Sequence, residues 1–287
     1  MADPLIVGCG YVGTRLARQY LKQGELPEGV VASDETRIRL DAEGISARRS
    51  DIDSDDLGML PLDGVRLFLL TPPPAVGGSD TRTRRLIDAF SRQGQPKRIV
   101  YISTTGVYGD CGGDWVDETR PVRPTVDRAR RRCDAEQVLR RWSQSGGGEL
   151  VVLRVAGIYG PGRLPLDRIV RGLPLVRVED SPWSNRIHVD DLVSTCIAAM
   201  ERGRNGAVYN VCDGHPSTMT EYFFQVADAL GLERPPVIPF EEAEGRLSVG
   251  MMSYMRESRR LSNRKMCEEL GVELRFPTLS AGLAKCI

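Results

Sequence analysis

The sequence lacks an excess of charge of either sign. Lys plus Arg total 39 and Asp plus Glu total 39, so the formal net charge is zero. A neutral chain offers no general attraction to nucleic acid or to an anionic membrane surface. Long apolar runs are also missing, since the stretch at 65–70 is broken by Arg66 and is far shorter than the roughly 20 residues that span a bilayer. A small molecule is therefore the expected partner, rather than nucleic acid or a membrane.

Histidine is scarce, and the cysteines do not form recognisable pairs. Two His residues accompany seven Cys residues, and no Cys-x-x-Cys occurs. This spacing favours neither a metal site nor a disulfide framework, so we expect reduced thiols and no metal. The first residues lead directly into an apolar stretch without the basic region and apolar core of a signal peptide. Together these absences predict a cytoplasmic protein.

What the sequence does contain is an alternation of short β-branched stretches with longer stretches of helical period. Such alternation is typical of right-handed βαβ units around a parallel sheet. It predicts an α/β fold, a doubly wound parallel sheet of the Rossmann type. Strands are expected at 5–7, 30–33, 65–71, 98–103 and 150–155, and helices at 10–23, 81–93 and 128–143. Later helices are expected at 189–202 and 220–230, a strand at 207–211, and an Arg-rich closing segment at 256–270.

A glycine-rich turn joins the first expected strand to the first expected helix. Its sequence is Gly8-Cys9-Gly10-Tyr11-Val12-Gly13. In a dinucleotide-binding turn, the first glycine permits the tight turn, the second admits the pyrophosphate, and the third allows close helix packing. The helix N-terminus then offers free N–H groups to the phosphates. The alternative is a strand-to-helix turn in which the glycines serve packing only.

The turn implies a cofactor, NAD or NADP, and a division of the chain. We expect an NAD(P)-binding Rossmann domain at 1–157 and a small C-terminal substrate lobe at 158–287, with segments that return to the core. Near the second strand, Asp34 could accept the 2′-hydroxyl of NAD, whereas Ser33 with Arg37 could hold the NADP phosphate. We lean slightly to NADP. The alternative is that these charges are an ordinary solvated helix start.

Further motifs resemble the atypical extended short-chain dehydrogenases/reductases, in the NAD-dependent epimerase/dehydratase family and its YeeZ-like branch. The resemblance covers nearly the whole chain. It rests on the order in which the matching motifs follow one another, more than on any single motif. These segments are Ser50-Asp51-Ile52-Asp53, 69–74 (LLTPPP), 101–109 (YISTTGVYG), 153–162 (LRVAGIYGPG), 185–192 (NRIHVDDL) and 209–213 (YNVCD).

This resemblance implies roles for particular residues. Asp51 and Ile52 would flank the adenine, while Thr105 would supply a hydroxyl near the reacting carbon. The cofactor would also be lined by Leu70, Thr71, Pro72 and Ser103, together with Tyr11 and Val12 of the turn. All of these positions follow the carboxyl ends of strands, where open α/β sheets bind their ligands.

Typical members carry Tyr-x-x-x-Lys on the next helix, where lysine assists proton transfer by the phenol. Aligning Ala135-Glu136 with the family's Ala-Glu places Arg128 and Arg132 at the Tyr and Lys positions. Because arginine stays protonated, Arg128 cannot act as the acid and base. The sequence therefore predicts that the usual pair is missing.

Three interpretations remain open. The first is an oxidoreductase or nucleotide-sugar epimerase/dehydratase-like enzyme with a relocated acid, for which Tyr108, Tyr159 and His188 are candidates beside Thr105. In the second, the arginines around Arg128 recognise an anionic substrate such as a nucleotide sugar. The third is a non-catalytic NAD(P)-binding sensor or scaffold. A homodimer is compatible with each interpretation.

Overall fold

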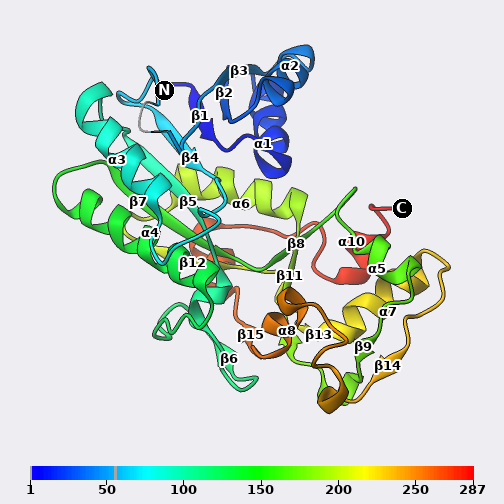
Figure 1. Ribbon diagram of the computed structural model, residues 1–287. Coiled ribbons are helices and arrows are strands. Elements are labelled where there is room, and N and C mark those ends of the chain that lie inside the picture. The colour runs from blue at the N-terminus through cyan, green and yellow to red at the C-terminus, as the bar shows by residue number, and fades with distance from the viewer. Residues whose placement is uncertain (1, 55–56) are drawn as a thin grey trace.

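A seven-stranded parallel sheet forms the centre of the protein (Figure 1). The structure, a computed structural model, describes residues 2–54 and 57–287. From edge to edge the strands run in the order β12, β7, β5, β4, β1, β2, β3, and all neighbours are parallel. Their bounds are β1 Pro4–Val7, β2 Glu28–Val31, β3 Ser46–Arg49, β4 Arg66–Leu69, β5 Arg98–Thr104, β7 Glu149–Val155 and β12 Val208–Val211. The predicted doubly wound sheet is confirmed.

Helices cover both faces of this sheet, and the side-chain alternation of the strands explains why. In β1, Leu5 and Val7 face one apolar cluster with α3 and α4, while Ile6 faces a second cluster with α1, α6 and α9. Both faces of the sheet are therefore buried under apolar side chains, as is typical of a parallel sheet. The helix bounds are α1 Tyr11–Lys22, α3 Thr81–Gln93, α4 Asp127–Gln144, α6 Val189–Arg202 and α9 Arg264–Leu270.

Two elements between β2 and β4 do not appear among the expected ones. Strand β3 is a polar edge strand whose partners are the backbone groups of β2, so it carries no apolar pattern. Helix α2 (Asp34–Ala42) buries only Leu40, which leaves little helical periodicity to find. The strand expected at 30–33 lies two residues earlier, at Glu28–Val31, because Ser33 caps α2 and its Oγ accepts from the Thr36 amide at 3.3 Å.

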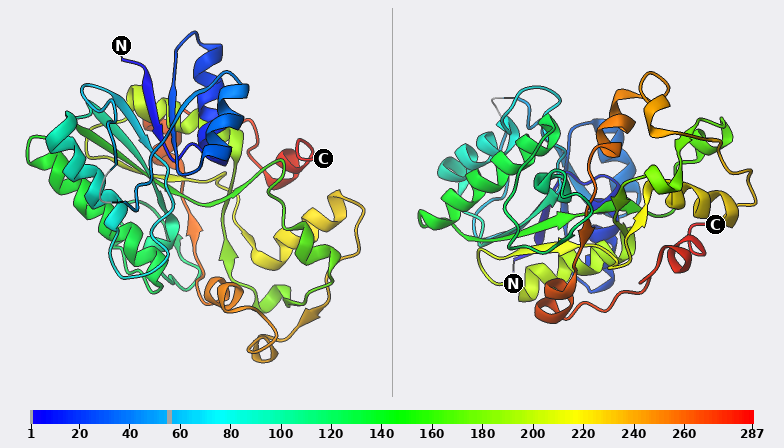
Figure 2. Two further views of the ribbon diagram at one scale, coloured as in Figure 1. Left: turned by 45° about the horizontal axis from the view of Figure 1, so that its top comes forward. Right: turned by 90° about the horizontal axis from the view of Figure 1, so that it is seen from below.

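Several segments of the second half of the chain form a smaller lobe beside the sheet (Figure 2). Four two-stranded pairs build it or join it to the sheet: β8 Gly157–Tyr159 with β11 Arg186–His188, β9 Leu175–Val176 with β14 Val237–Ile238, β10 Trp183–Ser184 with β13 Ser217–Thr218, and β6 Trp115–Val116 with β15 Arg260–Leu261. Its helices are α5 Leu166–Val170, α7 Met219–Ala229, α8 Val249–Met255 and α10 Leu279–Leu283. The chain returns to the sheet with α6 and β12, whereas the boundary at 157 stays a prediction.

The return to the sheet is fixed at the start of α6. His188 caps this helix, since its Nδ1 accepts from the Asp190 amide at 3.2 Å. Asp191 is fully buried, and its carboxylate accepts from the amides of Arg275 and Phe276 at 2.9 and 3.0 Å. Asp191 therefore anchors the C-terminal segment to the core. Within residues 2–54 and 57–287, no helix combines the length and the apolar character needed to cross a membrane.

Candidate functional site

The glycine-rich turn has the three-part geometry that its sequence predicts. Gly8 adopts a φ of 92°, and a Cβ there would lie 2.8 Å from the Thr71 amide nitrogen. At Gly13, a Cβ would lie 3.0 Å from the Gly8 carbonyl oxygen. A Cβ on Gly10 would instead meet nothing within 4 Å. Gly8 and Gly13 are thus constrained by the protein itself, while Gly10 borders the open space that a pyrophosphate would fill.

The adenosine end of the expected cofactor site carries a small charge network. The Asp34 carboxylate accepts from Arg37 Nε at 3.1 Å and from Arg49 Nη1 at 3.0 Å. The hydrogen bond from Arg37 is the main reason why the pKa of Asp34 is lowered. Arg49, at the end of the unpredicted strand β3, was missed from the sequence. Two guanidinium groups therefore gather around Asp34 beside the Ser33 cap.

Asp51 and Ile52, which the resemblance places beside the adenine, lie just after β3. Asp51 Oδ1 accepts from the Asp53 amide at 2.9 Å. Ile52 is partly buried and packs against the cluster beneath α3 and α4. Val12 is likewise partly buried at the start of α1. These residues therefore lie at the carboxyl ends of the parallel strands, where the glycine-rich turn also lies.

Arg132 of α4 reaches the strand ends that the sequence predicts beside the nicotinamide half of the cofactor. Its Nη1 donates to the Thr71 carbonyl at 2.8 Å and to the Tyr101 hydroxyl at 3.1 Å. It thereby ties the end of β4 to β5. Leu70 extends the hydrogen bonding between β4 and β1, since its amide donates to the Val7 carbonyl at 2.9 Å. The Pro72 carbonyl accepts from Arg82 Nη1 of α3 at 2.9 Å.

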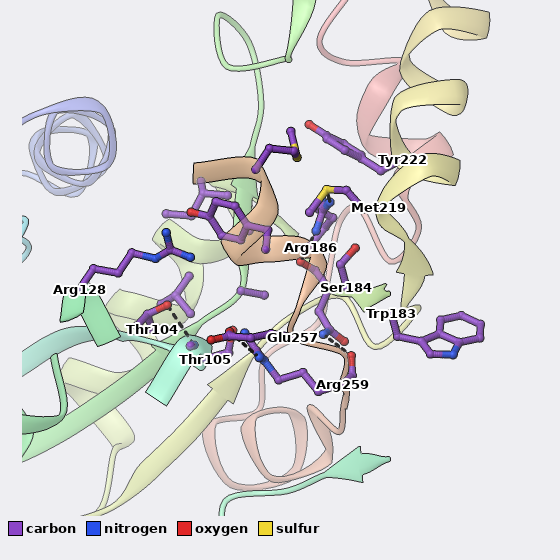
Figure 3. A pocket seen from close by; sticks show the side chains of 18 of the residues that line it. Thr104, Thr105, Arg128, Trp183, Ser184, Arg186, Met219, Tyr222, Glu257 and Arg259 are labelled. Carbon is purple, nitrogen blue, oxygen red and sulfur yellow. Dashed lines mark hydrogen bonds and ion pairs between the residues drawn. The ribbon is translucent and has the colours of Figure 1, made fainter. Parts of the chain in front are cut away.

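A cavity of about 380 Å³ opens between the ends of β5 and β7 and the smaller lobe (Figure 3). The hydroxyl-bearing Thr104 and Thr105 line it from the end of β5. Thr104 Oγ1 accepts from the Gly106 amide at 3.2 Å. The opposite wall comes from β10, β11, α7 and α8, including Ser184, Arg186, Met219, Tyr222 and Tyr254. Thr104 was missed, although it stands beside Thr105 in the same motif.

The cavity carries positive charge that carboxylates do not neutralise. Arg186 is only 8% exposed, yet no carboxylate of the described residues lies within ion-pair distance of it. Its Nη1 donates to the Asn185 carbonyl at 2.8 Å, and its guanidinium lies 4.2 Å from the Tyr222 ring centroid. Burial lowers the pKa of Arg186. A buried cation in this state favours an anionic ligand.

Other charged groups of the cavity divide into a pair and a single cation. Glu257 and Arg259 neutralise each other at 2.9 Å. Arg128 has a hydroxyl partner instead, because its Nη1 donates to Ser253 Oγ at 3.1 Å, and its guanidinium covers the Tyr254 ring at 4.1 Å. Helix α8 is therefore held to α4 by Arg128. The balance of the cavity is positive.

Of the four predicted catalytic residues, the structure brings only Thr105 to this cavity. Tyr108 is buried and donates to Asn210 Oδ1 at 2.7 Å. Tyr159 is fully buried, and its hydroxyl lies 3.5 Å from the Thr278 carbonyl. His188 caps α6 beneath Phe276, and burial lowers its pKa. These contacts stabilise the fold away from the cavity. Which group transfers a proton stays a prediction.

Ser103, predicted beside the cofactor, points into the protein instead. Its Oγ donates to Glu136 Oε1 at 2.6 Å. Glu136 also pairs with Arg154 at 2.8 Å, and all three side chains are buried. The outward hydroxyl at the end of β5 is therefore that of Thr104, because side chains alternate along a strand, while Thr105 begins the helical turn that follows the strand.

Asp213, which follows β12, is a buried carboxyl group whose titration is expected to make the stability of the protein depend on pH. Its Oδ1 accepts from the His215 amide at 2.9 Å, while its Oδ2 has no hydrogen-bond partner among the described residues. Burial raises the pKa of Asp213 to about 6. Because its ordinary value is near 3.8, this group's contribution to stability is complete below about pH 4. It is lost as the pH rises through 6.

We expect the Asp213→Asn variant to lose this dependence. Near pH 7.5 the variant is expected to be about 2 kcal/mol more stable than the wild type, because no buried carboxyl has to ionise. At pH 4 the two proteins are expected to be nearly equal. Urea unfolding at several pH values measures the difference in free energy of unfolding. A difference that is constant between pH 4 and 7.5 would contradict the buried-carboxyl account.

Comparisons with known proteins agree with this geometry. The NAD dependent epimerase/dehydratase family matches residues 81–212, and the chain belongs to that family. Protein YeeZ of Escherichia coli (strain K12) is 29% identical over 96% of this chain and 97% of its own length. A functionally unknown conserved protein from Silicibacter pomeroyi is 34% identical with a TM-score of 0.84, over 99% of this chain and 97% of that one.

A further solved structure shares the fold at lower identity. MoeE5 in complex with UDP-glucose and NAD is 22% identical with a TM-score of 0.77, over 99% of this chain and 97% of that one. At this identity the likeness concerns the fold, a Rossmann-type sheet with a second lobe.

Proposed function

We propose that the protein binds NAD(P) at the glycine-rich turn and acts as an oxidoreductase or an epimerase/dehydratase on an anionic small molecule, with a nucleotide sugar as the expected class. The observation that carries this proposal is Arg186, a buried guanidinium with no carboxylate of the described residues within ion-pair distance, in the cavity that also holds Thr104 and Thr105. The relative with bound UDP-glucose and NAD supports the substrate class. Reduced thiols support a cytoplasmic setting, since all seven cysteines are free.

The glycine-rich turn, Thr71 and the end of β2 lie close together and leave a place that fits the dinucleotide. Gly10 leaves room for the pyrophosphate, and the amides that begin α1 have no helical partners of their own. When bound, the nicotinamide ring would supply hydride transfer. Thr104 and Thr105 would orient the reacting oxygen by hydrogen bonding, while Arg186 would hold the acidic end of the substrate. With Arg128 and Arg132 in place of tyrosine and lysine, the proton would need another route.

A non-catalytic sensor is the second candidate. It is supported by Arg128, whose guanidinium already engages Ser253 and Tyr254 at the position of the family's tyrosine. In this case the cavity would bind its ligand and report cofactor occupancy to a partner protein. A homodimer stays a prediction under either candidate.

The proposal is tested by binding and turnover in the same samples. We expect UDP-glucose to bind the NAD-loaded protein in calorimetry, and Arg186→Met to weaken this binding at least about 30-fold, because a buried charge-assisted contact is lost. The matched control is Arg234→Met, since this arginine of the same lobe is exposed and paired with Asp228. Absence of UDP-glucose binding in the wild type would overturn the nucleotide-sugar assignment.

Turnover separates the two candidates. A screen of nucleotide sugars with NAD and NADP, followed at the absorbance of the reduced cofactor and by product analysis for epimerisation or dehydration, is expected to show a reaction for the enzyme. Binding of cofactor and UDP-glucose without any conversion across the screen would favour the sensor.

The preference for NADP is a separate prediction. Arg37 and Arg49 flank Asp34 at the end of β2, where a 2′-phosphate would arrive. We expect Arg37→Ala to weaken NADPH binding about 10-fold and to leave NADH binding nearly unchanged, because only NADPH carries the extra phosphate. Dissociation constants from the fluorescence of the reduced cofactors measure both. Equal effects on the two cofactors, or tighter binding of NADH by the wild type, would contradict the preference.

A further inference from the structure

A tyrosine at the first turn of α1 connects the glycine-rich turn to the loop after β8. Tyr11 donates its hydroxyl to the Pro161 carbonyl at 3.0 Å. The loop sits tightly on this side chain, because a Cβ at Gly160 would lie 2.6 Å from the Tyr11 hydroxyl and 2.6 Å from Val189 Cγ1. The loop is therefore latched over the start of α1, a connection of 150 residues along the chain.

Two arginines converge on the same ring. The guanidinium of Arg15 lies 4.0 Å from the ring centroid of Tyr11, and that of Arg163 lies 4.8 Å from it. Arg15 Nη1 also donates to the Tyr11 carbonyl at 3.1 Å. Neither guanidinium has an ion-pair partner among the described residues. Asp190, an acidic group that acts on Tyr11, lies 3.9 Å from Nδ1 of His188 and is paired with neither arginine.

Two unpaired cations on one side chain repel each other, and this cost falls when an anion lies between or beside them. Tyr11 is the first residue of the helix whose free amides face the expected pyrophosphate. The pyrophosphate of a dinucleotide carries two negative charges, which match two guanidinium groups in number and in preferred geometry. The two guanidinium groups and the Tyr11–Pro161 hydrogen bond thus all lie near the expected position of the pyrophosphate.

We propose that Arg15 and Arg163 are cationic arms for the pyrophosphate of the dinucleotide, and that Tyr11 holds the β8–α5 loop so that Arg163 reaches it. This assignment rests on the proposed NAD(P) binding and adds a side-chain contribution to a site otherwise made of backbone amides. Since NAD and NADP share the pyrophosphate, both arms serve both cofactors. Arg37 differs from these two arginines, because its expected partner is the 2′-phosphate that only NADP carries.

The experiment measures binding of NADH and NADPH by fluorescence, as a function of KCl concentration, with folding checked by thermal unfolding. We expect Arg163→Gln and Arg15→Gln each to weaken both cofactors about 5- to 10-fold, and the double variant about 50-fold. The plot of log Kd against log salt is expected to become shallower with each removed charge, since fewer ions are exchanged on binding. Tyr11→Phe, which removes only the latch, is expected to weaken binding about threefold. The control is Arg18→Gln on the same helix, which is exposed and paired with Glu43.

The outcomes distinguish this inference from the function on which it rests. If the wild type binds cofactor and both Gln variants match the Arg18→Gln control, the arms are refuted while NAD(P) binding stands. Weaker binding with an unchanged salt dependence would also refute them, because the effect would then be indirect. If the folded wild type binds neither cofactor, the proposed function itself fails.

Discussion

Replacing Gly10 with valine is expected to abolish the binding of NADH and NADPH while the protein stays folded. The valine side chain would occupy the space above the turn, where a Cβ meets no protein atom within 4 Å. The pyrophosphate requires that space to reach the amides of α1. We expect affinity to fall by at least about 100-fold, or 2.7 kcal/mol. Fluorescence titration measures the loss, and thermal unfolding is expected to show little change.

Gly8 provides the matched comparison for that result. A Cβ at Gly8 would lie 2.8 Å from the Thr71 amide nitrogen, and its φ of 92° disfavours any other residue. Gly8→Val is therefore expected to cost about 1 to 3 kcal/mol of folding stability. Retention of full cofactor affinity by Gly10→Val would show that the glycines serve packing only, which is the alternative that the sequence leaves open.

The central sheet and the turn could be predicted because their signals are local. In β1 every residue is buried, and the period of α1 places Leu16, Ala17 and Tyr20 on one face. Edge strand β3 could not be found in this way, since its stability comes from backbone pairing with β2 and its side chains are only partly buried. The helix after β2 has one buried residue and is held by its Ser33 cap and ion pairs.

The candidate site was only partly predictable, because its second wall comes from distant segments. Thr105 was found within a contiguous motif. Tyr222 and Tyr254 belong to α7 and α8, and nothing in their local sequence connects them to β5. Tyr108 and His188 also lie in contiguous motifs, yet the structure uses them in a core hydrogen bond and a helix cap. A motif shows that a residue is near the cleft, but the direction of its side chain depends on tertiary packing.

The largest effect on stability is expected from the ion pair behind the site. Arg154 and Glu136 are 3% and 1% exposed, and they join β7 to α4 at 2.8 Å. Arg154→Met leaves the Glu136 carboxylate buried with only Ser103 and the more exposed Arg140 as partners. A buried charge that loses its buried partner costs about 3 to 5 kcal/mol. We therefore expect a loss of that size in the free energy of urea unfolding.

Two comparisons identify the cause of that loss. Arg18→Met removes an exposed pair with Glu43, whose arginine side chain is 50% exposed, and is expected to cost less than about 1 kcal/mol. The double variant Arg154→Met/Glu136→Gln removes both charges and is expected to recover part of the stability, since no buried charge remains unpaired. If Arg154→Met costs no more than Arg18→Met, the ion pair does not hold β7 to α4. A double variant no more stable than Arg154→Met would assign the loss to packing of the arginine side chain, which also lies against the Tyr108 ring.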